Sequence, residues 1–207
     1  MIHVLEGIGP GSHPILEEAF RLRYRVCIEE RKWSLPVRDD QLDVDQFDGP
    51  HAVYLIAVES GTLVGHVRLL PTTRPHLLST VHRHICEIDY PRGPHVWEWT
   101  RYCIDRSHRG GAAFGRVSSE IMTGAVEWGL THGVHDAVLE FDPVWITRFG
   151  QLGFDVRPLG LPVDFDGETT IAVHLRYDHR ALERLRKARK IDAPVLRYET
   201  QAVAGTA

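Results

Sequence analysis

The first amphipathic segment of the chain carries an arginine in the middle of its apolar face. Read as a helix, the segment places Leu16, Ala19, Val26 and Cys27 on one face at spacings of three, four and seven residues, with Arg23 among them. A guanidinium that faces a protein core is costly unless a carboxylate meets it there. The fold must therefore bring acidic side chains against this helix. The candidates, with further cations beside them, are Asp45, Asp48, Glu98, Arg68 and Arg101.

Composition places the chain among ordinary globular proteins. Of its 207 residues 43% are hydrophobic and 25% are charged, and the net charge of −4 supplies no basic field for nucleic acid. No apolar run approaches the roughly 20 residues that span a bilayer, and the N-terminus lacks a signal-peptide pattern. The cysteines form no CxxC pair and the histidines lack metal-ligand spacing, so we expect no metal. We expect a cytoplasmic protein without membrane or nucleic-acid partners.

Hydrophobic periodicity alternates between strand and helix along the chain. Strands are expected at residues 2–6, 52–58, 62–70, 96–104, 137–141 and 168–175, and helices from 12 or 14 to 32–36, at 114–129, at 143–152 and at 179–190. This order predicts one α/β domain over residues 1–190. Its expected architecture is an acetyltransferase-like (GNAT-like) three-layer α-β-α sandwich with a mixed, mostly antiparallel sheet. Residues 191–207 are expected to form a loosely held tail.

Four short motifs follow one another in an order typical of one enzyme family. They are Leu22-Arg23-Tyr24-Arg25-Val26-Cys27 with Trp33 behind it, Asp45-Gln46-Phe47-Asp48, the run from Arg68 to Leu78, and Trp97-Glu98-Trp99-Thr100-Arg101-Tyr102. On these motifs the chain resembles the acyl-homoserine-lactone synthases, the LuxI-type autoinducer synthases, over most of its length. The second half of the chain is similar only loosely. Cys27 and Tyr102 depart from the phenylalanines that are usual in the family.

The resemblance implies acyl transfer from a thioester to the amine of S-adenosylmethionine. The substrate carboxylate then closes a lactone and expels 5′-methylthioadenosine, which yields a quorum-sensing signal. Adenosylmethionine and the thioester enter as substrates, and no tightly bound cofactor is implied. Acyl coenzyme A and acyl carrier protein both remain open as donors, so the carrier protein is a candidate partner.

The resemblance also assigns roles to the charged residues of the motifs. Glu98 is expected to act as general base toward the substrate amine, directly or through a water. Arg23 and Arg68 either bind the substrate carboxylate or hold the aspartates in place. The residues expected on the adenosylmethionine side, in the N-terminal half, are Arg23, Cys27, Trp33, Asp45, Asp48 and Arg68.

Arg101 poses a problem of geometry, because residues three apart in a regular strand face opposite sides. Either a bulge brings it to the side of Glu98, as often happens beside active sites, or its role is structural. We favour the structural role. Tyr102 is expected to support the site, since it keeps an aromatic ring and adds a hydroxyl.

The C-terminal half is expected to hold the acyl chain. Its candidate pocket residues are Met122, Val138, Phe141, Trp145, Ile146 and Phe149. The bulk of Trp145 favours a short, branched or aryl acyl group. Candidates for contact with phosphate or the carrier are Arg109, Gly110, Gly111 and Arg148. The resemblance implies that basic residues near 143–153 contact the carrier protein, and only Arg148 is available there, so coenzyme A is favoured as the carrier. The basic helix at 179–190 offers a docking face for an acidic carrier protein, but a solvated face is the simpler interpretation.

Two alternatives remain open. One is another N-acyltransferase of the same fold that joins acyl coenzyme A to a different amine. Such an enzyme would not need the Asp45–Asp48 pair together with Arg23 and Trp33. The other is a non-catalytic protein that senses adenosylmethionine or a thioester, which release of methylthioadenosine would exclude.

Overall fold

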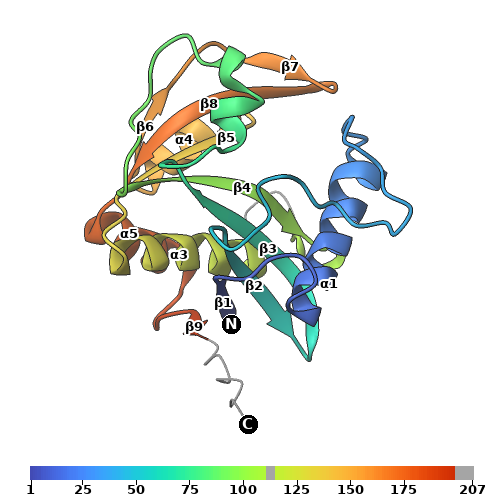
Figure 1. Ribbon diagram of the computed structural model, residues 1–207. Coiled ribbons are helices and arrows are strands. Elements are labelled where there is room, and N and C mark those ends of the chain that lie inside the picture. The colour runs from blue at the N-terminus through green and yellow to red at the C-terminus, as the bar shows by residue number, and fades with distance from the viewer. Residues whose placement is uncertain (111–114, 199–207) are drawn as a thin grey trace.

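The computed structural model describes residues 1–110 and 115–198, which form one open, twisted sheet with helices on its faces (Figure 1). The sheet order is β6-β8-β5-β4-β3-β2-β1-β9, and β7 pairs with β8. The strands are β1 Ile2–Glu6, β2 Val53–Glu59, β3 Thr62–Pro71, β4 Val96–Ile104, β5 Asp136–Phe141, β6 Asp155–Pro158, β7 Val163–Phe165, β8 Glu168–Arg176 and β9 Leu196–Tyr198. Two pairings are parallel, β1 with β9 and β4 with β5, and the others are antiparallel. The expected mixed, mostly antiparallel sheet is confirmed.

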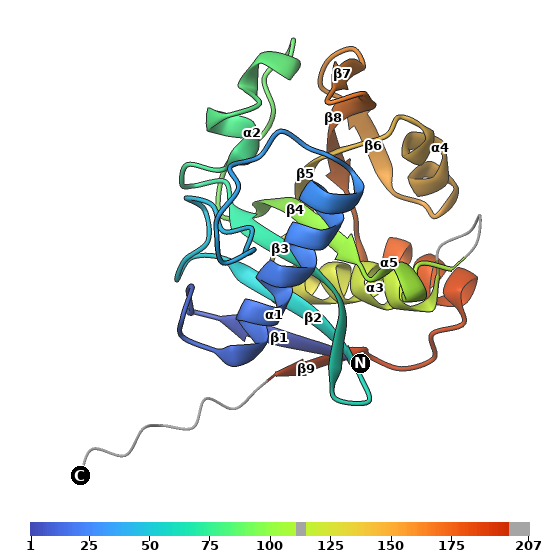
Figure 2. The same cartoon turned by 90° about the vertical axis from the view of Figure 1, so that its right-hand side faces the viewer.

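Helices complete the three expected layers, as Figure 2 shows from the side. They are α1 Pro14–Arg23, which continues as a π-helix over Tyr24–Glu30, α2 Leu77–Thr80, α3 Arg116–Thr131, α4 Val144–Gln151 and α5 His179–Arg189, with short 3-10 turns at Arg83–Ile85 and Arg106–His108. The first helix covers one face of the central strands, and α3 and α5 cover the other. Within the described residues no helix is long and apolar enough to cross a membrane.

The first helix follows from its sequence. Pro14 stands at the start, where its missing N–H costs nothing, and the imidazole of His13 accepts a hydrogen bond from Ile15 N at 3.3 Å. Its apolar face packs against the sheet in a cluster that includes Leu16 and Phe20. Arg23 lies on that face with 0% of its surface exposed, as the periodicity predicts.

Residues 191–207 were expected to form a loosely held tail, and for Leu196–Tyr198 this expectation is wrong. Leu196–Tyr198 forms β9, which pairs in parallel with Ile2–Val4 at the edge of the sheet. Three residues are too few to show a strand period, and the open edge of β1 supplies the backbone partners that order them. Residues 199–207 lie outside the described residues.

The centre of the sheet opens between β4 and β5. Their parallel pairing joins Val96–Trp99 to Asp136–Leu139 and stops there, although β4 runs on to Ile104. On its other side β4 carries a bulge, because two residues, 101 and 102, stand opposite Val67 alone. Arg101 has a φ of +52°, in the left-handed region that non-glycine residues rarely occupy. These two irregularities place a cavity at the middle of the sheet.

Candidate functional site

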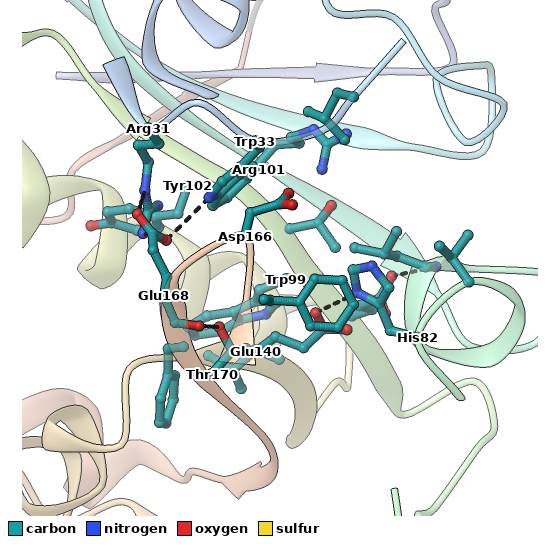
Figure 3. Close-up of a pocket in the computed structure, with 18 of the residues that line it drawn as sticks. Arg31, Trp33, His82, Trp99, Arg101, Tyr102, Glu140, Asp166, Glu168 and Thr170 are labelled. Carbon is teal, nitrogen blue, oxygen red and sulfur yellow. Dashed lines mark hydrogen bonds and ion pairs between the residues drawn. The ribbon is translucent and has the colours of Figure 1, made fainter. Parts of the chain in front are cut away.

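A cavity of about 1100 Å³ lies where β4 and β5 separate (Figure 3). Its walls come from segments far apart in the chain: the loops at 33–36 and 43–47, β4 at 98–102, β5 and the following turn at 139–142, the β7–β8 hairpin at 165–170, and side chains from α2, α3 and α4. The motifs of the N-terminal half therefore meet the apolar residues of the C-terminal half around one space.

Two buried arginines organise the acidic wall of this cavity. Arg23 donates from Nε to Asp43 Oδ2 at 3.0 Å and from Nη1 to Asp48 Oδ1 at 2.8 Å. Arg68 donates from Nη1 to Asp45 Oδ1 at 2.6 Å and lies 2.8 Å from Asp48 Oδ1. Both guanidiniums are fully buried and stand behind the wall, whereas Asp43 and Asp45 line the cavity. Two roles were expected for Arg23 and Arg68: to bind a substrate carboxylate or to hold the aspartates in place. The observed hydrogen bonds match the second role.

The arginines also keep the aspartates ionised. Burial acts to raise the pKa of Asp48, but Arg23 and Arg68 outweigh it and hold the pKa well below its ordinary value. The same balance lowers the pKa of Asp43 and of Asp45. The cavity wall therefore presents carboxylates with fixed charge and fixed direction.

Arg101 joins this cluster through the bulge. Its Nε donates to Asp43 Oδ2 at 2.9 Å, and its Nη2 lies 3.3 Å from Asp45 Oδ2. The strand bulge and the ion pairs of Arg101 are both present. The bulge therefore explains the direction of the side chain, and the ion pairs with Asp43 and Asp45 match a structural role. Asp43 was not among the expected site residues. Its spacing of two from Asp45 is the signal that could have found it, because extended backbone puts such residues on one side.

Glu98 lies in the cavity wall with its carboxylate held at both oxygens. Oε2 accepts a hydrogen bond from Leu77 N at 2.9 Å, and Oε1 accepts one from Leu78 N at 2.6 Å. Nδ1 of His76 lies 3.0 Å from Oε1. These contacts fix the carboxylate in one orientation at the wall of the cavity. His76, buried and on no expected list, is a neighbour that the sequence did not indicate.

Trp33 closes the mouth of the cavity together with the β7–β8 hairpin. Its Nε1 donates to Glu168 Oε2 at 3.1 Å, and Arg31 donates to both oxygens of the same carboxylate. Ser34 donates from its backbone N and its hydroxyl to Asp166, at 2.7 and 2.9 Å. The guanidinium of Arg31 covers one face of the Trp33 ring at 4.5 Å. These contacts, which Figure 3 marks in part, form a clasp across the cavity.

Four of the six residues expected around the acyl chain line the cavity: Met122, Phe141, Trp145 and Phe149. Val138 does not line the cavity, because it packs with Leu78 in a separate buried cluster. Ile146 packs against the main core instead of the cavity. Leu139 and Trp99 line the cavity in their place.

Cys27 and Tyr102 have different positions. Cys27 is buried beneath the wall, with its Sγ 3.8 Å from Sγ of Cys103, and does not line the cavity. Tyr102 does line it, and its hydroxyl lies 3.0 Å from Ser118 Oγ. Burial raises the pKa of Tyr102, so its phenol stays neutral.

The residues expected to meet a carrier are dispersed. Arg109 donates to Glu30 Oε2 at 2.6 Å and to Ile104 O at 2.8 Å, which uses two of its nitrogens. Arg148 stacks over Trp145 at 4.5 Å. Gly110 has a φ of +75°, and Gly111 lies outside the described residues. In the part of the chain that the structure describes, no three His, Cys, Asp or Glu side chains are arranged so that they could hold a metal ion.

Comparison with known proteins gives consistent results. The profile of the autoinducer synthase family matches residues 11–185. The chain is 34% identical over 185 residues to the isovaleryl-homoserine lactone synthase of Bradyrhizobium diazoefficiens, which covers 88% of this chain and 83% of that protein. It is 31% identical over 186 residues to an acyl-homoserine-lactone synthase of Pseudomonas aeruginosa, covering 87% and 88%.

Solved structures agree with the sequence comparison. The fold is similar to that of BjaI, a coenzyme A-dependent acyl-homoserine lactone synthase solved with adenosylmethionine and isopentyl-coenzyme A, with a TM-score of 0.86. The two chains are 31% identical, and the alignment covers 96% of this chain and 93% of that one.

Proposed function

This chain belongs to the autoinducer synthase family and is an acyltransferase, an acyl-homoserine-lactone synthase, and we propose that it joins a short, branched acyl group from coenzyme A to S-adenosylmethionine. The observation that carries the proposal is the cavity with two unlike ends. One end presents the carboxylates of Asp43, Asp45 and Glu98, which suit a cationic amino acid. The other is lined by apolar side chains that include the bulky Trp145, which suits a short acyl chain.

The acidic end would bind adenosylmethionine and prepare its amine. Asp43 and Asp45, held ionised by the arginines behind them, attract the ammonium and sulfonium charges. Glu98 accepts a proton from the ammonium, directly or through a water, so that the neutral amine can attack the thioester carbonyl. Its hydrogen bonds from Leu77 N and Leu78 N keep it in one orientation during this transfer.

The open edge of β4 would stabilise the developing oxyanion. Past Trp99 this strand has no β5 partner, and we assign the oxyanion hole to its backbone N–H groups there. The amine nitrogen forms the amide bond as the carbon–sulfur bond of the thioester breaks and the thiolate leaves. The substrate carboxylate then attacks its own γ-carbon, which breaks the sulfonium bond and releases 5′-methylthioadenosine with the lactone.

Two observations support a branched coenzyme A donor. The bulky Trp145 lines the apolar part of the cavity together with Phe149. Relatives named for isovaleryl-homoserine lactone and for dependence on coenzyme A resemble this chain over most of its length.

The test is mass spectrometry of reactions that contain the purified protein, adenosylmethionine and one acyl donor at a time. Short, branched, aryl and long acyl groups are offered on coenzyme A and on acyl carrier protein. We expect an acyl-homoserine lactone and methylthioadenosine in equal amounts, with the branched coenzyme A donor turned over fastest. A preference for long chains or for the carrier protein would contradict the donor proposal. An acylated amine without methylthioadenosine would contradict lactone synthesis itself.

A further inference from the structure

A second carboxylate lines the cavity on the strand next to Glu98. Glu98 on β4 stands opposite Val138 on β5, and Glu140 follows two residues later on the same face of the sheet. Two strand residues span about 7 Å, so the two carboxylates lie at separate points along one wall. Leu139 and Phe141 point to the other face, where the acyl candidates Met122 and Phe149 pack. Glu140 is therefore on the amine side of the cavity and not on the acyl side.

Glu140 has one partner and one vacant oxygen. Its Oε2 lies 2.6 Å from Nδ1 of His82, a contact drawn in Figure 3. Its Oε1 is buried and has no hydrogen-bond partner among the described residues. A buried carboxylate oxygen without a donor is costly, so a ligand that supplies one would be favoured. Burial raises the pKa of Glu140, and the contact with His82 offsets this only in part.

Two aromatic rings adjoin the Glu140 carboxylate. The ring of His82 lies 4.5 Å from the ring of Phe165 in β7, centroid to centroid, and both side chains line the cavity. Phe165 belongs to the same β7–β8 hairpin as Glu168, the residue that Trp33 contacts. An acceptor oxygen beside aromatic rings matches a nucleoside, which has hydroxyl donors next to a flat base.

We propose that Glu140 and His82 form the ribose subsite, in which the vacant Oε1 of Glu140 accepts a hydrogen bond from a hydroxyl of the adenosyl group. The inference rests on the proposed function, since adenosylmethionine carries an ammonium at one end and ribose hydroxyls at the other. Carboxylates recognise ribose hydroxyls in dinucleotide sites by the same contact. His82 is a positioning residue, because its Nδ1 holds the other oxygen, Oε2, of Glu140.

The test couples a change in the protein to a change in the ligand. Isothermal titration calorimetry measures the binding of 5′-methylthioadenosine and of its 2′-deoxy and 3′-deoxy analogues. The proteins are the wild type, Glu140→Leu and the control Glu87→Gln, an exposed glutamate away from the cavity. In the wild type, loss of one hydroxyl should weaken binding roughly 10-fold or more, as for a hydrogen bond to a charged group. Glu140→Leu should bind methylthioadenosine and the analogue that lacks the contacting hydroxyl with equal affinity. Glu87→Gln should show the same loss of affinity for that analogue as the wild type.

A structural role for Glu140 would weaken all three ligands alike and would leave the hydroxyl dependence intact, which overturns the subsite. Should Glu140→Leu fail to fold, Glu140→Gln serves instead. It keeps an acceptor but loses the charge, so the penalty for the missing hydroxyl should drop below 10-fold. A wild type that binds methylthioadenosine without any hydroxyl dependence overturns the subsite alone. A wild type that does not bind methylthioadenosine overturns the proposed function as well.

Discussion

Replacing Asp48 by asparagine is expected to destabilise the protein far more than this nearly isosteric change suggests. The carboxylate is fully buried, accepts from Arg23 Nη1 at 2.8 Å, lies 2.8 Å from Arg68 Nη1, and accepts from the Tyr54 hydroxyl at 3.1 Å. The cluster contains three guanidiniums and three carboxylates, so asparagine leaves one buried positive charge without a counter-ion. Removing one partner of a buried ion pair costs about 3–5 kcal/mol.

Urea unfolding followed by circular dichroism measures this cost. With a slope of about 2 kcal/mol per molar urea, the midpoint of Asp48→Asn should fall by roughly 1.5–2.5 M. The matched control is Asp40→Asn in the same loop, where an exposed carboxylate pairs with Arg38, and its midpoint should not move. If the two variants unfold at the same urea concentration, burial does not set the value of these charges and the reasoning is wrong.

Four further predictions concern pH and the cavity. The folded pKa values of the clustered aspartates lie below the ordinary value of 3.8, so their stabilisation is complete above that pH and is lost as the pH falls below it. Urea midpoints should therefore drop below about pH 4, and less steeply in Asp48→Asn; equal slopes would contradict this. Glu98→Gln should lower the turnover number by a factor of about 10²–10⁴ with methylthioadenosine binding retained, as kinetics and calorimetry will show, and full turnover would exclude Glu98 as the base. Trp145→Ala should shift the ratio of kcat/KM toward longer acyl donors by roughly 10-fold or more, in competition assays read by mass spectrometry; an unchanged ratio would place the acyl chain elsewhere. Glu168→Gln should leave the urea midpoint unchanged, because the ion pair of Glu168 with Arg31 is partly exposed. It should raise the KM for adenosylmethionine a few-fold, because Trp33 loses its contact with the carboxylate. An unchanged KM would mean that the contacts of Glu168 do not affect substrate binding.

The central strands were predictable because burial imposes a regular pattern on them. Val96–Ile104 has the expected bounds, and the β2–β3 hairpin lies within one residue of expectation at each end. Helix α2 gave no such signal. It has four residues, and its first N–H groups are satisfied by Glu98, some twenty residues away in sequence. An element stabilised by a distant side chain leaves little trace in its own residues.

The candidate site was predictable as a set of charges but not as a surface. The motifs indicated which charged residues gather, yet only the structure separates Asp45, which lines the cavity, from Asp48 and Cys27, which lie behind it. For the two aspartates that distinction depends on a loop without periodicity. The placement of Val138 on the face opposite to Leu139 and Phe141, by contrast, follows from strand alternation and could have been anticipated. Glu140 escaped notice because its partner His82 comes from a segment with no strand or helix pattern.

The pairing of β1 with β9 also has a consequence for how the protein is made. Residue 2 leaves the ribosome early, whereas its neighbour Leu196 follows nearly 200 residues later. At about 5–20 residues per second, that interval lasts roughly 10–40 s. During this time β1 can pair with β2, but its outer edge stays open to strands of other chains. Crowded synthesis at high expression should therefore favour aggregation through this edge, and slower synthesis at lower concentration should increase the yield of folded protein.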